Sequence, residues 1–172
     1  MAIRNILKNE DLTLNKKSRL VTDFNKRLHI LLDDMRETLI EANGLGLAAV
    51  QVGVLRRAVL VVDLDDEAET PEEQIFELIN PAIIAESGEQ VGSEGCLSIP
   101  GVYGIVPRPD LVKVKAEDRN GIPFEKWFEG LSARAVCHEI DHLEGIVFTS
   151  LAERILTEEE LNELKAEKEE SE

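Results

Sequence analysis

The chain has 172 residues, of which 43% are hydrophobic and 31% are charged, a composition typical of one soluble globular domain. Its net charge of −16 argues against a broad basic face, so we expect no membrane association and no direct nucleic-acid binding. Only two cysteines are present and the N-terminus lacks an apolar signal segment, which together favour a reduced, cytoplasmic protein.

Helical spacing defines the first predicted element. An amphipathic helix of about 20 residues is expected to start at Thr22-Asp23, because apolar side chains then recur every three or four positions. Asn43-Gly44 should end this helix, since both residues tolerate the left-handed conformation. Residues 44–51 follow, and they predict either a helix stop with a small-residue strand or a backbone segment that packs closely against a ligand.

Strand patterns fill the middle of the chain. Buried, interrupted and alternating apolar runs predict, in chain order, a strand over residues 57–62, an acidic surface loop over 63–73, a strand over 75–86 broken at Asn80-Pro81, and a hairpin of 111–117 with 122–129. Glycine and proline bound residues 92–101, which are therefore expected to be irregular.

The segment 130–145 contains His138-Glu139-Ile140-Asp141-His142. On a helix, His138 and His142 fall within roughly 40° of each other, with Glu139 close to the same face. Two imidazoles and an adjacent carboxylate suit a divalent metal with a base beside its open position. Such a pentapeptide also occurs by chance, but the apolar residues around most of this helix predict that it is buried, and buried histidines need partners.

A catalytic metal site of this kind usually takes a third protein ligand. Cys96 is the best candidate, because it follows Gly95 in the segment expected to be irregular and a thiolate binds Zn²⁺ or Fe²⁺ well. The alternative is that Cys96 is a small buried hydrophobe. His29 is expected to be a surface or already satisfied residue, and Glu144 should turn away from the site.

Three segments together resemble the peptide deformylase family. The family carries Gly-h-Gly-h-Ala-Ala-x-Gln, where h is apolar, and here this is Gly44 to Gln51. Its Glu-Gly-Cys-Leu-Ser corresponds to Glu94 to Ser98, and its His-Glu-x-Asp-His-Leu-x-Gly corresponds to His138 to Gly145. The segments occur in the family's order, and the resemblance covers nearly the whole chain.

The resemblance implies a role for each matching residue. Cys96, His138 and His142 would be the metal ligands, and Glu139 would be the acid and base. Gln51 and the backbone N–H of Leu97 would form an oxyanion hole, and Arg108 would pair with Glu94. The implied reaction removes the formyl group from N-formylmethionine of nascent peptides and releases formate. The implied metal is one Fe²⁺ per chain, with Zn²⁺, Ni²⁺ or Co²⁺ as possible occupants.

The methionine side chain of such a substrate needs an apolar pocket. Candidates next to the motifs are Leu45, Gly46, Leu131, Ala135 and Val136, each of which could equally belong to the core. The expected fold class is α+β, with a buried metal-binding helix wrapped by small, mostly antiparallel sheets, a long N-terminal helix and a C-terminal helix. Residues 1–156 are expected to form a single catalytic domain.

The departures from the family pattern include Cys137 and the acidic C-terminal segment. Cys137 stands where the family usually has glutamine; we expect it to serve packing, and a disulfide with Cys96 on oxidation is the rival interpretation. Residues 157–172 contain eight glutamates and two lysines, and predict an acidic helix or tail that starts at Thr157 and docks through Leu161 and Leu164. Transient association with the ribosome is implied by the resemblance, but an acidic tail would repel RNA.

Two other functions remain open from the residues alone. A general metallopeptidase would take a downstream acid or histidine as its third ligand, in place of Cys96. A metal-stabilised structural protein would close its site with four protein ligands, and the fourth would have to be Cys137 or His29.

Overall fold

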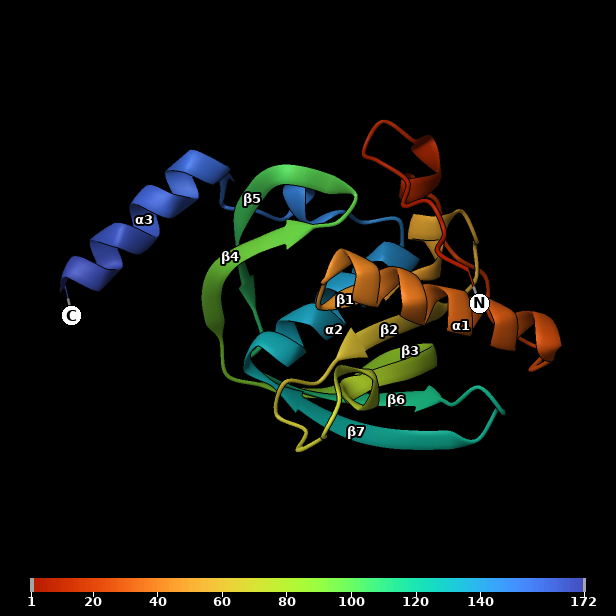
Figure 1. Cartoon of the computed structure of the whole chain (residues 1–172). Helices are drawn as coiled ribbons and strands as arrows, with labels where there is room; N and C mark the ends of the chain where they lie inside the picture. Colours follow the sequence, from red (N-terminus) through yellow and green to blue (C-terminus); the bar gives the residue numbers. More distant parts are fainter. Residues whose placement is uncertain (1, 172) are drawn as a thin grey trace.

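The computed structural model describes residues 2–171. Met1, the first residue of the predicted domain 1–156, and Glu172, the last residue of the predicted tail 157–172, lie outside the described residues. Two antiparallel sheets surround a central helix (Figure 1). The larger sheet has the order β1-β2-β3-β6-β7, formed by Gly46–Ala48, Ala58–Val62, Ile75–Ser87, Leu111–Glu117 and Pro123–Glu129. The smaller sheet has the order β4-β5-β8, formed by Gln90–Cys96, Ile99–Arg108 and Arg154–Thr157. The expected α+β class is confirmed.

Helices α1 (Lys26–Ala42) and α2 (Gly130–Leu143) cover opposite faces of the larger sheet. Strand β2 shows this most directly, because Val59 and Val61 join the apolar cluster of α2 whereas Leu60 joins that of α1. Side chains alternate between the faces of a strand, so a strand buried on both faces is apolar throughout. Helix α2 also contacts β5, and therefore lies between the two sheets (Figure 1).

The first helix starts later than the sequence pattern predicted. Its N-cap is Asn25, whose side-chain oxygen accepts a hydrogen bond from the Leu28 N–H at 3.1 Å. The predicted start at residue 22 is wrong because the chain is still held in an extended path there. Val21 N–H donates to Asn80 Oδ1, and Asn80 Nδ2 donates to Val21 O, both at 2.9 Å. The predicted end is confirmed, since Asn43 adopts the left-handed conformation with φ 54°.

The prediction that residues 92–101 are irregular is wrong. Strands β4 and β5 form a hairpin through it, and only two residues separate them. The glycines of this hairpin make room for side chains: a Cβ on Gly95 would lie 2.9 Å from the Tyr103 ring, and one on Gly104 would lie 3.1 Å from the Phe148 ring. Glycine in a strand can mark such a close approach instead of a loop.

The remaining elements largely follow the predictions. Strand β3 shifts register between Ile79 and Ala82, where the break was expected, and then continues to Ser87. Strands β6 and β7 pair as the expected hairpin. Helix α3 (Glu158–Ser171) begins after Thr157, whose Oγ1 accepts a hydrogen bond from the Glu160 N–H, and it extends away from the sheets (Figure 1). Within residues 2–171, every helix is too short or too polar to cross a membrane.

Candidate metal centre and active site

Cys96, His138 and His142 converge at the centre of the molecule. Cys96 Sγ lies 3.4 Å from His142 Nε2, which lies 3.2 Å from His138 Nε2, and the three donor atoms all fall within 4.8 Å of one another. Helix α2 supplies the two histidines one turn apart, and the end of β4 supplies the cysteine. Sulfur and imidazole donors bind zinc at about 2.3 Å and about 2.0 Å, so donors at these separations can share one ion.

A carboxylate behind His138 orients its ring. His138 Nδ1 lies 3.1 Å from Glu94 Oε2, so the ring can donate its proton to Glu94 and direct the Nε2 lone pair toward Cys96 and His142. Burial alone would raise the pKa of Glu94, but hydrogen bonds from His138 and Arg108 outweigh burial and lower that pKa to about 2. Glu94 is therefore a permanent carboxylate that fixes one face of the centre.

Two buried arginines hold Glu94 in turn. Arg108 Nη2 and Nε donate to its two carboxylate oxygens at 2.6 and 3.1 Å, and Arg134 Nη1 donates to Oε1 at 3.3 Å. Arg108 also pairs with Asp141 at 2.7 Å. The Glu94–Arg108 pair was expected from the resemblance, whereas the parts of Asp141 and Arg134 were not predicted. Their positions in the helix offered a signal, since both lie within one turn of His138.

His142 is prepared to bind as a neutral ring. It is fully buried, and its Nδ1 atom has no hydrogen-bond partner among the described residues. Burial, with the nearby charge of His138 second, lowers the pKa of His142 to about 3. A neutral imidazole with a free lone pair is the form that binds a metal.

Glu139 lies beside the three donors without joining them. Its Oε1 is 3.9 Å from His138 Nε2 and 4.0 Å from His142 Nε2, and its Oε2 is buried with no partner among the described residues. Burial raises the pKa of Glu139 to about 7, which suits a group that takes up and returns a proton at neutral pH. Gly46 makes this position possible, because a Cβ there would lie 2.7 Å from Glu139 Cγ.

Gln51 presents its amide nitrogen to the centre. Gln51 Oε1 accepts a hydrogen bond from the Ala48 N–H at 2.9 Å, which orients the amide. Its Nε2 then donates to Ser98 Oγ at 3.1 Å and approaches Cys96 Sγ at 3.5 Å. Ser98 was not singled out from the sequence, although it belongs to the second motif. Leu97 follows Cys96 in the turn between β4 and β5.

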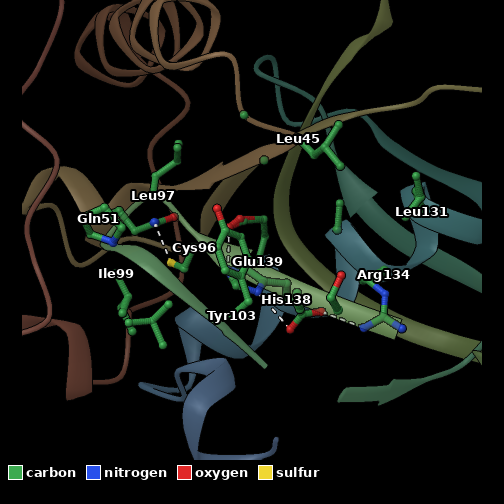
Figure 2. Close-up of a pocket in the computed structure, with 18 of the residues that line it drawn as sticks. Leu45, Gln51, Cys96, Leu97, Ile99, Tyr103, Leu131, Arg134, His138 and Glu139 are labelled. Atoms are coloured by element: carbon green, nitrogen blue, oxygen red, sulfur yellow. Dashed lines mark hydrogen bonds and ion pairs between the residues drawn. The ribbon is translucent and has the colours of Figure 1, made fainter. Parts of the chain in front are cut away.

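A cavity of about 520 Å³ opens onto these residues (Figure 2). Four of the five candidates for the substrate pocket, Leu45, Gly46, Leu131 and Ala135, line it. Val136 does not line the cavity; it is fully buried and packs toward the larger sheet, because it lies on the opposite side of α2. Further lining residues missed from the sequence include Ile99, Tyr103 and Arg134.

The remaining candidate ligands are engaged elsewhere. Cys137 is a buried free thiol in the cluster between α2 and the larger sheet, and burial raises its pKa to about 11. Cys96 is also free, so the structure contains no disulfide between them. His29 Nε2 bonds to the Arg119 carbonyl at 2.8 Å, and Glu144 pairs with Arg57. Neither Cys137 nor His29 can therefore close a structural four-ligand site.

Comparisons with known proteins relate nearly the whole chain to one family. A family model described as polypeptide deformylase matches residues 3–157. A curated peptide deformylase from Caldicellulosiruptor bescii is 52% identical over 166 residues, covering 96% of this chain and 95% of the relative. Peptide deformylase 1 of Bacillus subtilis is 46% identical over 96% of this chain and 99% of its own length.

Solved structures give the same result for the backbone. A peptide deformylase from Legionella pneumophila has a TM-score of 0.80 and 38% identity, covering 97% of this chain and 98% of the other. A peptide deformylase from Thermotoga maritima has a TM-score of 0.81 and 30% identity, covering 90% and 100%. The likeness therefore includes the architecture that surrounds the three motifs.

Proposed function

The chain belongs to the polypeptide deformylase family, and from this premise we propose which residues carry the reaction and with which metal. It is a metal-dependent hydrolase that removes the formyl group from N-formylmethionine of newly made polypeptides and releases formate. The reaction belongs to N-terminal processing during protein biosynthesis.

Cys96, His138 and His142 are proposed to hold one metal ion per chain. The convergence of their three donor atoms within 4.8 Å, with Glu139 Oε1 at 3.9 and 4.0 Å from the Nε2 atoms of the two histidines, is the observation that carries this proposal. One thiolate and two imidazoles suit several divalent ions, and we propose Fe²⁺ as the cellular metal, with Zn²⁺, Ni²⁺ or Co²⁺ able to bind the same donors. When bound, the ion lowers the pKa of a water molecule and polarises the formyl carbonyl.

Glu139 is proposed to move the protons of the reaction. Its Oε2 takes a proton from the attacking water and later returns a proton to the amine that leaves as the new amino terminus. A pKa of about 7 supports both steps, because the carboxyl can exist in either form near neutral pH. The buried position of Glu139 keeps its proton from exchanging freely with solvent.

Gln51 and Leu97 are proposed to stabilise the oxygen that gains negative charge when water adds to the formyl carbon. Gln51 Nε2 already points toward Cys96, and the Leu97 N–H belongs to the next residue in the chain. Preorganised donors of this kind each contribute about 3–4 kcal/mol to lowering the barrier. Their rigidity comes from the Ala48 and Ser98 hydrogen bonds that hold the Gln51 side chain.

The substrate is proposed to enter as an extended peptide. The cavity lies between β1 and β4, which are the edge strands of the two sheets, so both offer unpaired backbone groups. Leu45, Gly46, Leu131 and Ala135 then form the apolar pocket for the methionine side chain. N-formylmethionyl nascent chains are the partners that this arrangement accepts.

The rest of the molecule is assigned in outline. We infer that residues 1–156 form the catalytic domain and that residues 157–172 are an acidic appendage with net charge −6. Like charges would keep this appendage away from RNA, so any transient ribosome contact should use another surface. Two free thiols and a nascent-chain substrate favour the cytoplasm as its location.

Formate release from formyl-Met-Ala-Ser tests the proposal. Wild type loaded with Fe²⁺ without oxygen should release formate, whereas Cys96→Ala should lose both metal and activity. Cys137→Ala is the matched control, because this thiol faces the sheet, and it should keep both. Absence of formate from every metal form of the wild type would refute the proposed deformylase activity. Full metal content in Cys96→Ala would refute the assignment of Cys96 as a metal ligand.

A further inference from the structure

Tyr103 is held across the strand that leads into the metal centre. It lies opposite Gly95 in the β4–β5 pairing, and Gly95 directly precedes Cys96. A Cβ on Gly95 would come within 2.9 Å of both Cδ1 and Cε1 of the tyrosine, so the ring lies directly against the glycine. Any other residue at position 95 would force this ring to shift, so the glycine is what allows the ring to lie against β4.

The Tyr103 side chain belongs to the wall of the cavity. It is half-buried, and it lines the same space as Cys96, His138 and Glu139 (Figure 2). Its hydroxyl makes no hydrogen bond to any residue within 2–171. An aromatic ring that is packed on one side and open to a binding cavity on the other offers a rigid contact at small entropic cost.

We propose that Tyr103 is a positioning residue for the part of the peptide that follows the formylmethionine. This inference rests on the proposed substrate placement, with the formyl group at Cys96 and His138 and the methionine side chain against Leu131 and Ala135. A peptide that leaves these two positions along the edge of β4 passes Gly95, where the tyrosine ring lies. The ring thus holds the peptide backbone and keeps the formyl carbon near Glu139.

A substrate-length comparison tests this role. We would measure kcat/KM for formyl-Met-amide and formyl-Met-Ala-Ser with wild type, Tyr103→Ala and Tyr103→Phe. Loss of the ring should lower the preference for the longer substrate about three- to tenfold, mainly through KM, as expected for one aromatic contact. Tyr103→Phe should keep most of the preference, because it retains the ring.

Trp127→Ala is the matched control. Trp127 is the only tryptophan, lies exposed on β7 and does not line the cavity, so its loss should leave the substrate preference unchanged. Equal losses on both substrates in Tyr103→Ala, or a phenylalanine variant that behaves like alanine, would overturn the positioning role. Failure of the wild type on both substrates would instead reject the proposed active site.

A direct readout is available because Tyr103 is the only tyrosine. Labelling with 3-fluorotyrosine places a single fluorine reporter at this position in the zinc-loaded enzyme. The product peptide Met-Ala-Ser should shift its ¹⁹F resonance, and methionine amide, which lacks the following residues, should shift it much less. A resonance that stays unmoved at saturating Met-Ala-Ser would show that the ring does not contact the peptide.

Discussion

Helices α1 and α2 both bury polar side chains, but the two helices differ in how these side chains are paired. On α1, Asp34 accepts hydrogen bonds from the Ala2 N–H at 2.8 Å and from Arg4 Nε at 2.9 Å. Thr38 accepts one from the Arg4 N–H and donates one to the Asp34 carbonyl. We call this set the N-terminal clasp, because it fixes residues 2–4 on the helix.

On α2, by contrast, Glu139 Oε2 and His142 Nδ1 have no partner among the described residues. An unpaired buried polar atom costs about 1–3 kcal/mol, so a chain keeps one only where something else requires it. Ser18 Oγ and, on α1 itself, Glu37 Oε2 are also buried and unpaired, which shows that one such atom does not make a site. The difference lies in what surrounds the α2 atoms: Glu139 lines the cavity beside the three donor atoms, and His142 Nδ1 belongs to the ring whose Nε2 is one of those donors.

Glu139→Gln should separate activity from stability most strongly. The amide keeps the shape of the side chain but cannot take a proton from water, so formate release should fall about 10²- to 10⁴-fold. Metal content should not change. The free energy of unfolding should stay the same or rise slightly, because a buried unpaired carboxylate has been removed. Formate assays, metal analysis and denaturant unfolding of the same preparations measure the three quantities.

Opposite results would break the comparison between the helices. A strong loss of stability in Glu139→Gln would mean that this carboxylate supports the fold, as Asp34 does. Activity within a fewfold of wild type would remove Glu139 from the proton transfers.

Glu94→Gln should damage both stability and the metal centre. The substitution leaves Arg134 buried without a negative partner and Arg108 with Asp141 alone, and breaking a buried ion pair in this way costs about 3–5 kcal/mol. It also weakens the acceptor that orients His138, so metal affinity should fall about 10- to 100-fold. Thermal unfolding and competition with a chelator measure the two effects.

The same variant should change the pH dependence of stability. The pKa of Glu94 is about 2 in the folded protein and near its ordinary 4.5 in the unfolded chain. The unfolded state therefore binds more protons, and the stability from Glu94 is present above pH 4.5 and is lost as the pH falls toward 2. In the metal-free protein, Glu94→Gln should flatten this part of the curve. An unchanged slope between pH 4.5 and pH 2 would contradict the assignment.

Much of this arrangement was predictable from local sequence. The spacing of His138 and His142, with Glu139 between them, required only the geometry of one helix. The apolar run of β2 and the hairpin of β6 with β7 likewise depend on neighbouring residues. These predictions succeeded because each pattern reports a contact within one element or between adjacent ones.

Contacts between distant elements were harder to predict. The segment 92–101 was expected to be irregular because its glycines resemble loop residues, yet Gly95 is needed for packing against Tyr103 inside a hairpin. Val136 was assigned to the pocket because it is apolar and near the motif, and only the packing of α2 against the sheet shows which side it faces. Residue type and spacing do not contain this information.

Gly46→Ala tests how closely the site is packed around its base. The added methyl group would lie 2.7 Å from Glu139 Cγ and should push the carboxylate out of position. A displacement of about 1 Å can cost up to 10²-fold in rate, so activity should fall about 10- to 100-fold while the metal stays bound. Gly53→Asn is the control, since no atom lies near its Cβ position and asparagine tolerates its φ of 85°. Unchanged activity in Gly46→Ala would show that Glu139 can move without loss.

Asp34→Ala gives the smallest effect and the opposite pattern to Glu139→Gln. Removing the carboxylate leaves the Ala2 N–H and Arg4 without their acceptor, which should cost about 2 kcal/mol of unfolding free energy. Formate release per metal ion should stay within about twofold of wild type, because the N-terminal clasp does not line the cavity. Glu41→Ala, an exposed carboxylate on the same helix, should change neither quantity and controls for loss of charge. A loss of activity in Asp34→Ala as strong as its loss of stability would contradict this division, in which Asp34 of α1 supports the fold and Glu139 of α2 supports the reaction.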